Sequence, residues 1–290
     1  MLDSLLSALE DWIRGMLTEY ISANLTFMFI DVNEKTGSIA NMVGKTPQSW
    51  NSGIFSMVRQ LSQTVMVPIA GMIIAFVLCY ELISMLTERN NMHEIDTWMF
   101  YKWIFKSFIA VYLVTHTFDI TMAIFDIGHH AVSVAAKVIG KDTAIDVLGV
   151  VESFNAAMAT MSIGELLSLS LETMIVSLGM KIISVLVTVV LYGRMIEIYL
   201  YTSIAPIPFA TFTNREWGQI GNNYARGLLA LGFQGFFIMV LVGIYCVLVN
   251  SMTVSPDVHS SLFSIGAYTV VLCFALFKTG SISKSIFNAH

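Results

Sequence analysis

Eight polar or ionisable side chains lie inside strongly apolar stretches of this sequence, and their types decide which chemistry the chain could perform. They are His116, Asp119, Asp126, Glu172, Lys181, Ser184, Arg194 and Glu197. Charged groups within a bilayer are costly, so they usually face protein or water. These side chains could therefore line a lumen or a helix interface, hydrogen-bond between helices, or relay protons.

His116, Asp119 and Asp126 fall along one face of a predicted helix, with Asp126 near the membrane interface. Three interpretations stay open for this face. It could line a polar lumen or a subunit interface, form structural hydrogen bonds between helices, or act as a proton relay.

Lys181 is expected near the middle of the membrane, within a seam of polar side chains at helical spacing. The other members of the seam are Ser170, Ser177, Ser184 and Thr188. A lysine at that depth either pairs with an acid on another helix or faces a water-filled passage. Asp119 and Glu172 are the candidate acids, and both interpretations stay open.

The longest apolar run covers residues 166–212 and contains only four charged residues. One crossing takes about 20 apolar residues, so the run is too long for one upright span and contains no loop for two. We predict a helix over residues 166–201, roughly 54 Å long at about 1.5 Å per residue. Pro206 and Pro208 should end it, because proline lacks a backbone donor and clashes with the preceding turn. Arg194, Glu197 and Tyr201 form a polar stripe near that end.

The composition indicates a polytopic membrane protein. Hydrophobic residues make up 56% of the 290 residues and charged residues only 12%, against about a quarter charged in soluble domains. The net charge of −5 gives no basic stripe of the kind that grips nucleic acid.

No residue pattern in the sequence predicts an enzyme, a metal site or a cofactor site. The cysteines, Cys79, Cys246 and Cys273, lie in apolar runs without ligand spacing, and we interpret them as small buried hydrophobes. The histidines at 129 and 130 have no carboxylate or cysteine partner at ligand spacing.

The predicted fold is an all-α polytopic membrane protein with about five transmembrane helices. The spans are expected over residues 61–86, 98–127, 166–201, 227–249 and 262–277. We also predict an amphipathic helix over residues 3–30 that packs against neighbouring subunits or lies at the membrane interface, and a polar loop over 31–51. Residues 88–96 are expected to form a second loop, and residues 128–165 an extracytoplasmic connection with short helices over 130–139 and 142–161. The chain is thus expected to comprise five segments, residues 1–60, 61–127, 128–165, 166–213 and 214–290.

Small residues on two spans predict close helix packing. Gly71 and Ala75 share one side of the first span with Pro68, which should kink it. Gly232, Gly235 and Gly243 share roughly one face of the fourth span.

The distribution of basic residues predicts the sidedness. Lys278 and Lys284 follow the last span, whereas the loop over residues 251–261 has no Lys or Arg, which places the C-terminus in the cytoplasm. Five spans then put the N-terminus and residues 128–165 outside. A six-span alternative, in which residues 166–212 cross twice, also keeps most basic residues cytoplasmic.

The order of motifs around the proline break resembles a known family. An arginine and an aromatic-rich helix precede Ala-Pro-x-Pro, and a polar turn and a glycine-rich span follow. The sequence there reads GRMIEIYLYTSIAPIPFATF, NREWGQIGNNYARG and LLALGFQGFFIMVLVGIY. Over residues 192–245 this resembles the TrbL-like (Vir-type) polytopic inner-membrane subunit of type IV secretion and conjugation machines.

The resemblance implies a homo-oligomeric ring, with five subunits as its suggested number, in the bacterial cytoplasmic membrane. It also implies contacts with secretion ATPases and other membrane subunits, and only transient contact with a DNA–protein substrate. The alternative from another functional class is a secondary transporter or proton-coupled permease that uses Asp119, Glu172 and Lys181 as coupling groups. Such folds usually show paired interrupted spans, and this sequence has one strong break.

Overall fold

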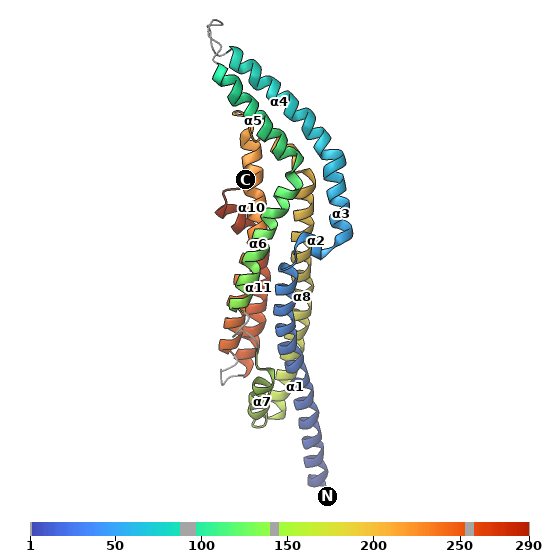
Figure 1. Ribbon diagram of the computed structural model, residues 1–290. Coiled ribbons are helices and arrows are strands. Elements are labelled where there is room, and N and C mark those ends of the chain that lie inside the picture. The colour runs from blue at the N-terminus through green and yellow to red at the C-terminus, as the bar shows by residue number, and fades with distance from the viewer. Residues whose placement is uncertain (1, 88–96, 140–144, 253–257, 290) are drawn as a thin grey trace. The chain divides into compact units, whose positions relative to one another are not determined.

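The computed structural model describes residues 2–87, 97–139, 145–252 and 258–289, and every element in those ranges is a helix (Figure 1). In chain order the elements are α1 (Leu2–Val43), α2 (Pro47–Trp50), α3 (Ser52–Leu61), the π-helical turn η1 (Ser62–Met66), α4 (Val67–Thr87), α5 (Thr97–Thr115), α6 (Thr117–Ile139), α7 (Val147–Met158), α8 (Ile163–Ile204), α9 (Pro206–Thr211), α10 (Gly218–Met252) and α11 (Val258–Ile286). The predicted all-α class is confirmed.

Within the described residues, five helices are long and apolar enough to cross a membrane, as predicted. They are Ser52–Thr87, Thr117–Ile139, Ile163–Ile204, Gly218–Ser251 and Val258–Ile286. The second of them lies later in the chain than the predicted span over residues 98–127. The first half of the predicted span forms a separate helix, α5. The early turns of α5 carry Lys102 and Lys106 among Trp and Tyr residues, and such side chains are typical of the membrane interface.

The chain divides into two compact units. The first comprises Met1–Val43, Ser133–Leu191 and Phe237–Lys278, and the second Gly44–Val132, Tyr192–Phe236 and Thr279–His290. Four helices, α6, α8, α10 and α11, contribute residues to both units.

The core of the first unit is built around α1. Ile21, Leu25, Met28 and Phe29 are at most 1% exposed, and their spacing places them on one helical face. The ring of Phe29 lies 6.1 Å from that of Phe154 on α7. Helix α1 thus docks on its own unit along its second half. Packing of the amphipathic segment against neighbouring subunits stays a prediction.

The predicted loop over residues 31–51 is wrong for its first part, because α1 continues to Val43. Apolar residues keep the helical spacing there, and Val32, Ile39 and Val43 are each 2% exposed. The side-chain amide of Asn33 forms two hydrogen bonds with the backbone of Ile145. It donates to Ile145 O and accepts from Ile145 N–H, each at 3.0 Å.

The second unit is layered around the short helix α9, which contacts α4 and α5. Ala210 packs with a cluster of buried residues on these two helices. Those residues are Ala70 and Ile74 on α4 and Ala110 and Val114 on α5. Figure 1 shows α4 and α5 side by side, with α3 continuing into α4 as one curved helix.

The predicted irregularity at Pro68 takes the form of a π turn. The N–H of Val67 bonds the carbonyl of Ser62, five residues back. Proline has no backbone N–H, so it cannot donate a hydrogen bond to the carbonyl four residues earlier. A π turn just before the proline accommodates the missing hydrogen bond.

The connection predicted over residues 128–165 is partly a continuation of α6. Residues 130–139 belong to α6 instead of forming a separate helix. Of the second predicted helix, Val147–Met158 is found as α7, and residues 140–144 lie outside the described residues. The predicted loop over residues 88–96 also lies outside them.

Candidate functional site

The kink between α8 and α9 is the feature around which the second unit is organised. Helix α8 ends at Ile204, as the two prolines predict, and α9 starts at Pro206. Ala205 keeps a helical backbone conformation, and its N–H bonds Thr202 O at 3.4 Å. The helical hydrogen-bond pattern is therefore interrupted at the prolines without the chain opening into a loop.

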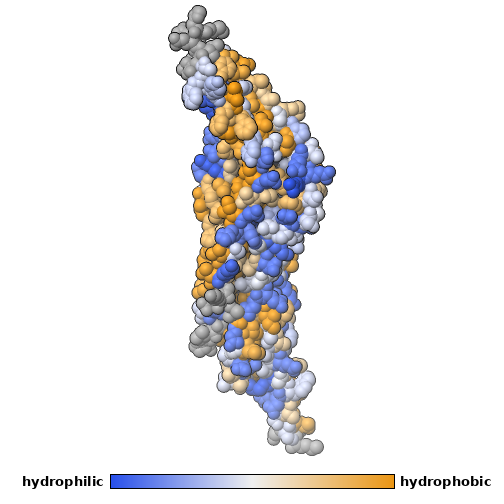
Figure 2. Space-filling model, in the orientation of Figure 1, coloured by the Kyte–Doolittle hydropathy of each residue, from blue (hydrophilic) through white to orange (hydrophobic). Residues whose placement is uncertain are grey.

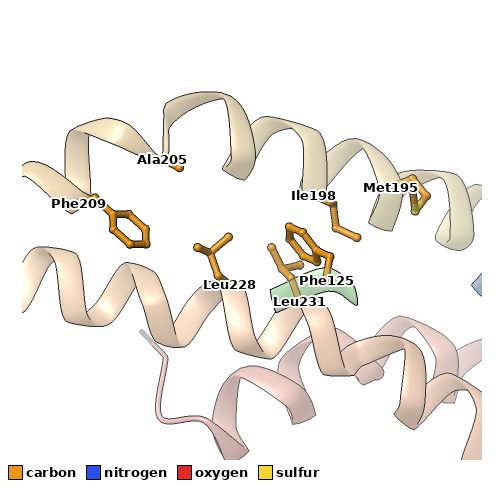
Figure 3. Packing of buried hydrophobic residues seen from close by; sticks show 7 residues of the cluster. All are labelled: Phe125, Met195, Ile198, Ala205, Phe209, Leu228 and Leu231. Atoms are coloured by element: carbon orange, nitrogen blue, oxygen red, sulfur yellow. The ribbon is translucent and has the colours of Figure 1, made fainter. Parts of the chain in front are cut away.

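Buried apolar side chains hold this kink (Figure 3). Ala205 and Phe209 point from the kinked segment toward Leu228 on α10, and Phe125 of α6 lies beside Leu231 and Ile198. All seven residues of the cluster are at most 5% exposed. The kink is thus fixed by packing from α6 and α10 as well as by proline geometry.

The turn after α9 is closed by side-chain caps and one glycine. Asn214 accepts hydrogen bonds from the N–H groups of Glu216 and Trp217 at 2.8 and 2.9 Å. A methyl group added at Gly221 would lie 2.7 Å from Pro208 O, so only glycine permits this approach. Gly221 was not singled out by its sequence context.

The polar stripe at the end of α8 contains a buried cation. Arg194 is 8% exposed, its Nη2 donates to Leu231 O at 3.5 Å, and its Nε has no partner among the described residues. The carboxylate of Glu197 instead accepts from Lys284 of α11 at 3.0 Å. The sequence singled out Arg194 and Glu197 but not Lys284 as their neighbour.

Polar residues of α10 and α11 continue this stripe. Gln234 Nε2 donates to Thr279 Oγ1 at 3.3 Å, and Ser283 Oγ donates to Ala230 O at 2.5 Å. Gln234 Oε1 is buried and has no partner among the described residues. Hydrogen bonds of this kind between helices are the structural role that polar residues take inside membranes.

Lys181 and Glu172 lie in the first unit with separate partners. Lys181 Nζ lies 4.8 Å from the ring centre of Phe27 on α1, an arrangement that attracts a cation. Glu172 accepts from His259 of α11, with 2.7 Å between Oε2 and Nδ1. Glu172, one of the two candidate acids for Lys181, is therefore paired with His259.

Ser184 belongs to a polar cluster that the sequence did not predict, because two members lie in the presumed loop. Lys35 of α1 donates to Ser184 Oγ and lies 3.6 Å from the carboxylate of Asp31. These residues border a cavity of about 20 Å³, room for one water molecule. Tyr245 and Thr269, 2.9 Å apart through their hydroxyls, border it from α10 and α11.

The polar face predicted over His116, Asp119 and Asp126 starts at the junction of α5 and α6. All three side chains are exposed. The ring of His116 stacks on Tyr112, with 4.2 Å between ring centres. Asp119 lies 3.8 Å from Arg59 of α3. The neighbouring Thr117 and Thr121 are buried, and their hydroxyls donate to the backbone of α5 and α6 respectively, so the ionisable side faces outward.

The predicted small-residue faces are used unequally. Gly232 packs on α6, where a methyl group added at Gly128 would lie 2.3 Å from Gly232 O. Gly243 packs on the side chain of Ile139, and Gly235 is buried. By contrast, a methyl group at Gly71 would meet nothing within 4 Å. Ala75 is exposed, so that face of α4 is not covered within its unit.

Two of the three cysteines are buried as predicted, whereas Cys79 on α4 is exposed. The exposed surface of that helix is apolar, so a small hydrophobic side chain suits it.

Comparison with protein families matches residues 32–206, more than half of the chain, to the family described as TrbL/VirB6 plasmid conjugal transfer like protein. No curated protein and no solved structure matches the chain. The matched segment runs from the second half of α1 to the proline that starts α9. The chain therefore belongs to the TrbL/VirB6-like family of plasmid conjugal transfer proteins, which are components of type IV secretion machines.

Proposed function

We propose that this protein is a channel or scaffold subunit that forms a homo-oligomeric ring in the bacterial cytoplasmic membrane. The substrate of conjugation, a DNA–protein complex, passes through or beside this ring. The observation that carries the proposal is the outward orientation of ionisable groups within candidate spans. Asp119, Asp126 and Lys181 are all exposed on the single chain.

Lipid is a poor environment for Asp126 and Lys181, which lie near the middle of their candidate spans, whereas Asp119 lies in the first turn of its span. Placing a carboxylate or an ammonium at the bilayer centre costs about 3 kcal/mol on insertion scales. A sister subunit or a water-filled lumen removes most of that cost. We therefore assign Asp119, Asp126 and Lys181 to a lumen or to a subunit interface, together with His116.

The uncovered face of α4 supports contacts between copies of the chain. Gly71 and Ala75 leave a shallow strip, and strips of small residues let membrane helices approach closely. Larger apolar side chains flank it, and Met72 and Phe76 are 68% and 61% exposed. Figure 2 shows this apolar surface in orange over α4 and α5, whereas hydrophilic residues gather over α3.

The proposal includes partners and a role without catalysis. Family membership points to a structural subunit of a multi-component machine. We infer contacts with the secretion ATPases and with other membrane subunits, and no enzymatic activity of the chain itself.

The mass of the detergent-solubilised particle, measured by light scattering, tests the ring. We expect a multiple of the 32.1 kDa chain mass. The variant Gly71→Leu should lower it, because the new side chain fills the strip. Met72→Leu, one residue away at a flanking position, should leave it unchanged. A single-chain particle that drives uptake of a small solute would instead establish a secondary transporter.

A further inference from the structure

A pocket of about 360 Å³ lies within the second unit, between the end of α8, the start of α10 and the end of α11. Tyr201, Asn223, Tyr224 and Lys284 are among its wall residues. Its volume falls within the range of ligand sites, about 300–1,000 Å³. The residues of the proposed lumen are not part of it.

Lys284 lies on the pocket wall and has hydrogen-bond donors that its partner Glu197 does not use. Its Nζ donates to Glu197 at 3.0 Å and lies 6.0 Å from the ring centre of Tyr201. An ammonium group has three donors, and Glu197 takes one of them. The remaining donors can bind an acceptor that enters the pocket.

A second cation, Arg226, is not a wall residue but is hydrogen-bonded to the residue that precedes the wall residue Ala289. It lies between the wall residues Tyr224 and Gly227 in α10, and its Nη1 donates to Asn288 O at 3.5 Å. Asn288 has φ 49° and ends the chain's last helical turn, which brings Ala289 to the wall. Glu197 pairs with Lys284, whereas no carboxylate lies within 4.0 Å of the Arg226 guanidinium among the described residues.

The aromatic walls are held in place by their own contacts. The rings of Tyr201 and Tyr224 stack with 5.6 Å between centres, and the Tyr224 hydroxyl donates to Tyr201 O. The pocket therefore combines a fixed aromatic wall with the ammonium group of Lys284.

We propose that this pocket binds a phosphate-bearing anion through Lys284 and Arg226. Arginine and lysine are the side chains that proteins use for phosphate, arginine through its planar fork and lysine as a point charge. Basic pockets between membrane helices accept the headgroups of anionic lipids. A soluble phosphate shares the same chemistry. This inference is independent of ring formation.

Native mass spectrometry of the detergent-solubilised full chain tests the inference with added phosphatidylglycerol, and with phosphatidylcholine as the neutral comparison. We expect retention of phosphatidylglycerol in the wild type. Arg226→Gln and Lys284→Gln should each weaken it about fivefold. Lys278→Gln is the matched control for Lys284→Gln, because it removes the same charge from an exposed position of the same helix that is not on the pocket wall.

A second arm uses inorganic phosphate and follows the thermal unfolding of the same proteins. The site is assigned to a soluble phosphate if phosphate raises the Tm only when both Arg226 and Lys284 are present, and if phosphatidylglycerol is not retained more than phosphatidylcholine. The double variant Glu197→Gln/Lys284→Gln removes the pair without leaving an unpaired carboxylate, so a folding defect of Lys284→Gln alone does not obscure the result. Equal binding of both lipids combined with no cation-dependent effect of phosphate overturns the proposal.

Discussion

Asp31 and Lys35 lie on a continuous helix, although the surrounding sequence has the composition of a turn. Their carboxylate and ammonium are four residues apart, a spacing that brings side chains together on a helix. Lys35 also donates to Ser184 on α8, so the pair ties α1 to its neighbour. The polar residues are tolerated because each has a partner, and partners on other helices are invisible in one sequence.

A double-mutant cycle on this pair measures that contribution. Lys35→Met leaves the Asp31 carboxylate, 19% exposed, without its cation, and should lower the free energy of unfolding by about 1–3 kcal/mol. Adding Asp31→Asn should recover part of the loss. Thermal unfolding in detergent provides the measurement, and strictly additive effects of the two substitutions would show that the pair is not coupled.

At the scale of elements, the crossing of α6 and α10 depends on two glycines. A methyl group added at Gly128 would lie 2.3 Å from the carbonyl oxygen of Gly232 and 2.7 Å from its carbonyl carbon. Both contacts are with backbone, so no side-chain rearrangement can relieve them. Gly232 was expected to pack closely from its spacing with Gly235 and Gly243. Gly128 was not, because its segment was interpreted as a connection.

Gly128→Ala should therefore force the two helices apart and cost about 1–3 kcal/mol of stability. Gly179→Ala is the matched control within α8, since a methyl group there meets nothing within 4 Å. The control should be neutral or stabilising by about 0.5–1 kcal/mol, because alanine loses less conformational freedom in a helix. Chemical denaturation of both variants gives the comparison, and equal stabilities would contradict a close crossing.

Local rules predicted the ends of elements better than their continuity. Pro206 ends α8 because its missing backbone N–H removes a hydrogen bond within the same turn. The position of the proline is visible in the sequence alone. The extension of α1 to Val43 and of α6 to Ile139 depends on packing against other helices, which a pattern of polar residues does not reveal. Likewise, the motifs that suggested the family lie in residues 192–245, whereas the family match covers residues 32–206. Only residues 192–206 are common to both.

At the scale of the whole molecule, the number of crossings decides which segments meet the cytoplasm. Residues 163–204 form one unbroken helix, which fits the five-span arrangement, because a second crossing would require a turn within them. Five crossings with a cytoplasmic C-terminus leave α7 outside the cell. Six crossings would place α7 and the C-terminus on the same side.

Cysteine labelling distinguishes the two arrangements. We expect Ala159→Cys, exposed at the end of α7, to react with a membrane-impermeant maleimide on intact spheroplasts. Ser285→Cys, exposed near the end of α11, should react only after the membrane is permeabilised. The background should carry alanine in place of Cys79, which is exposed, whereas Cys246 and Cys273 are buried. Protection of both introduced cysteines until permeabilisation would support six crossings, because α7 would then share the cytoplasm with the basic C-terminal end that the positive-inside rule places there.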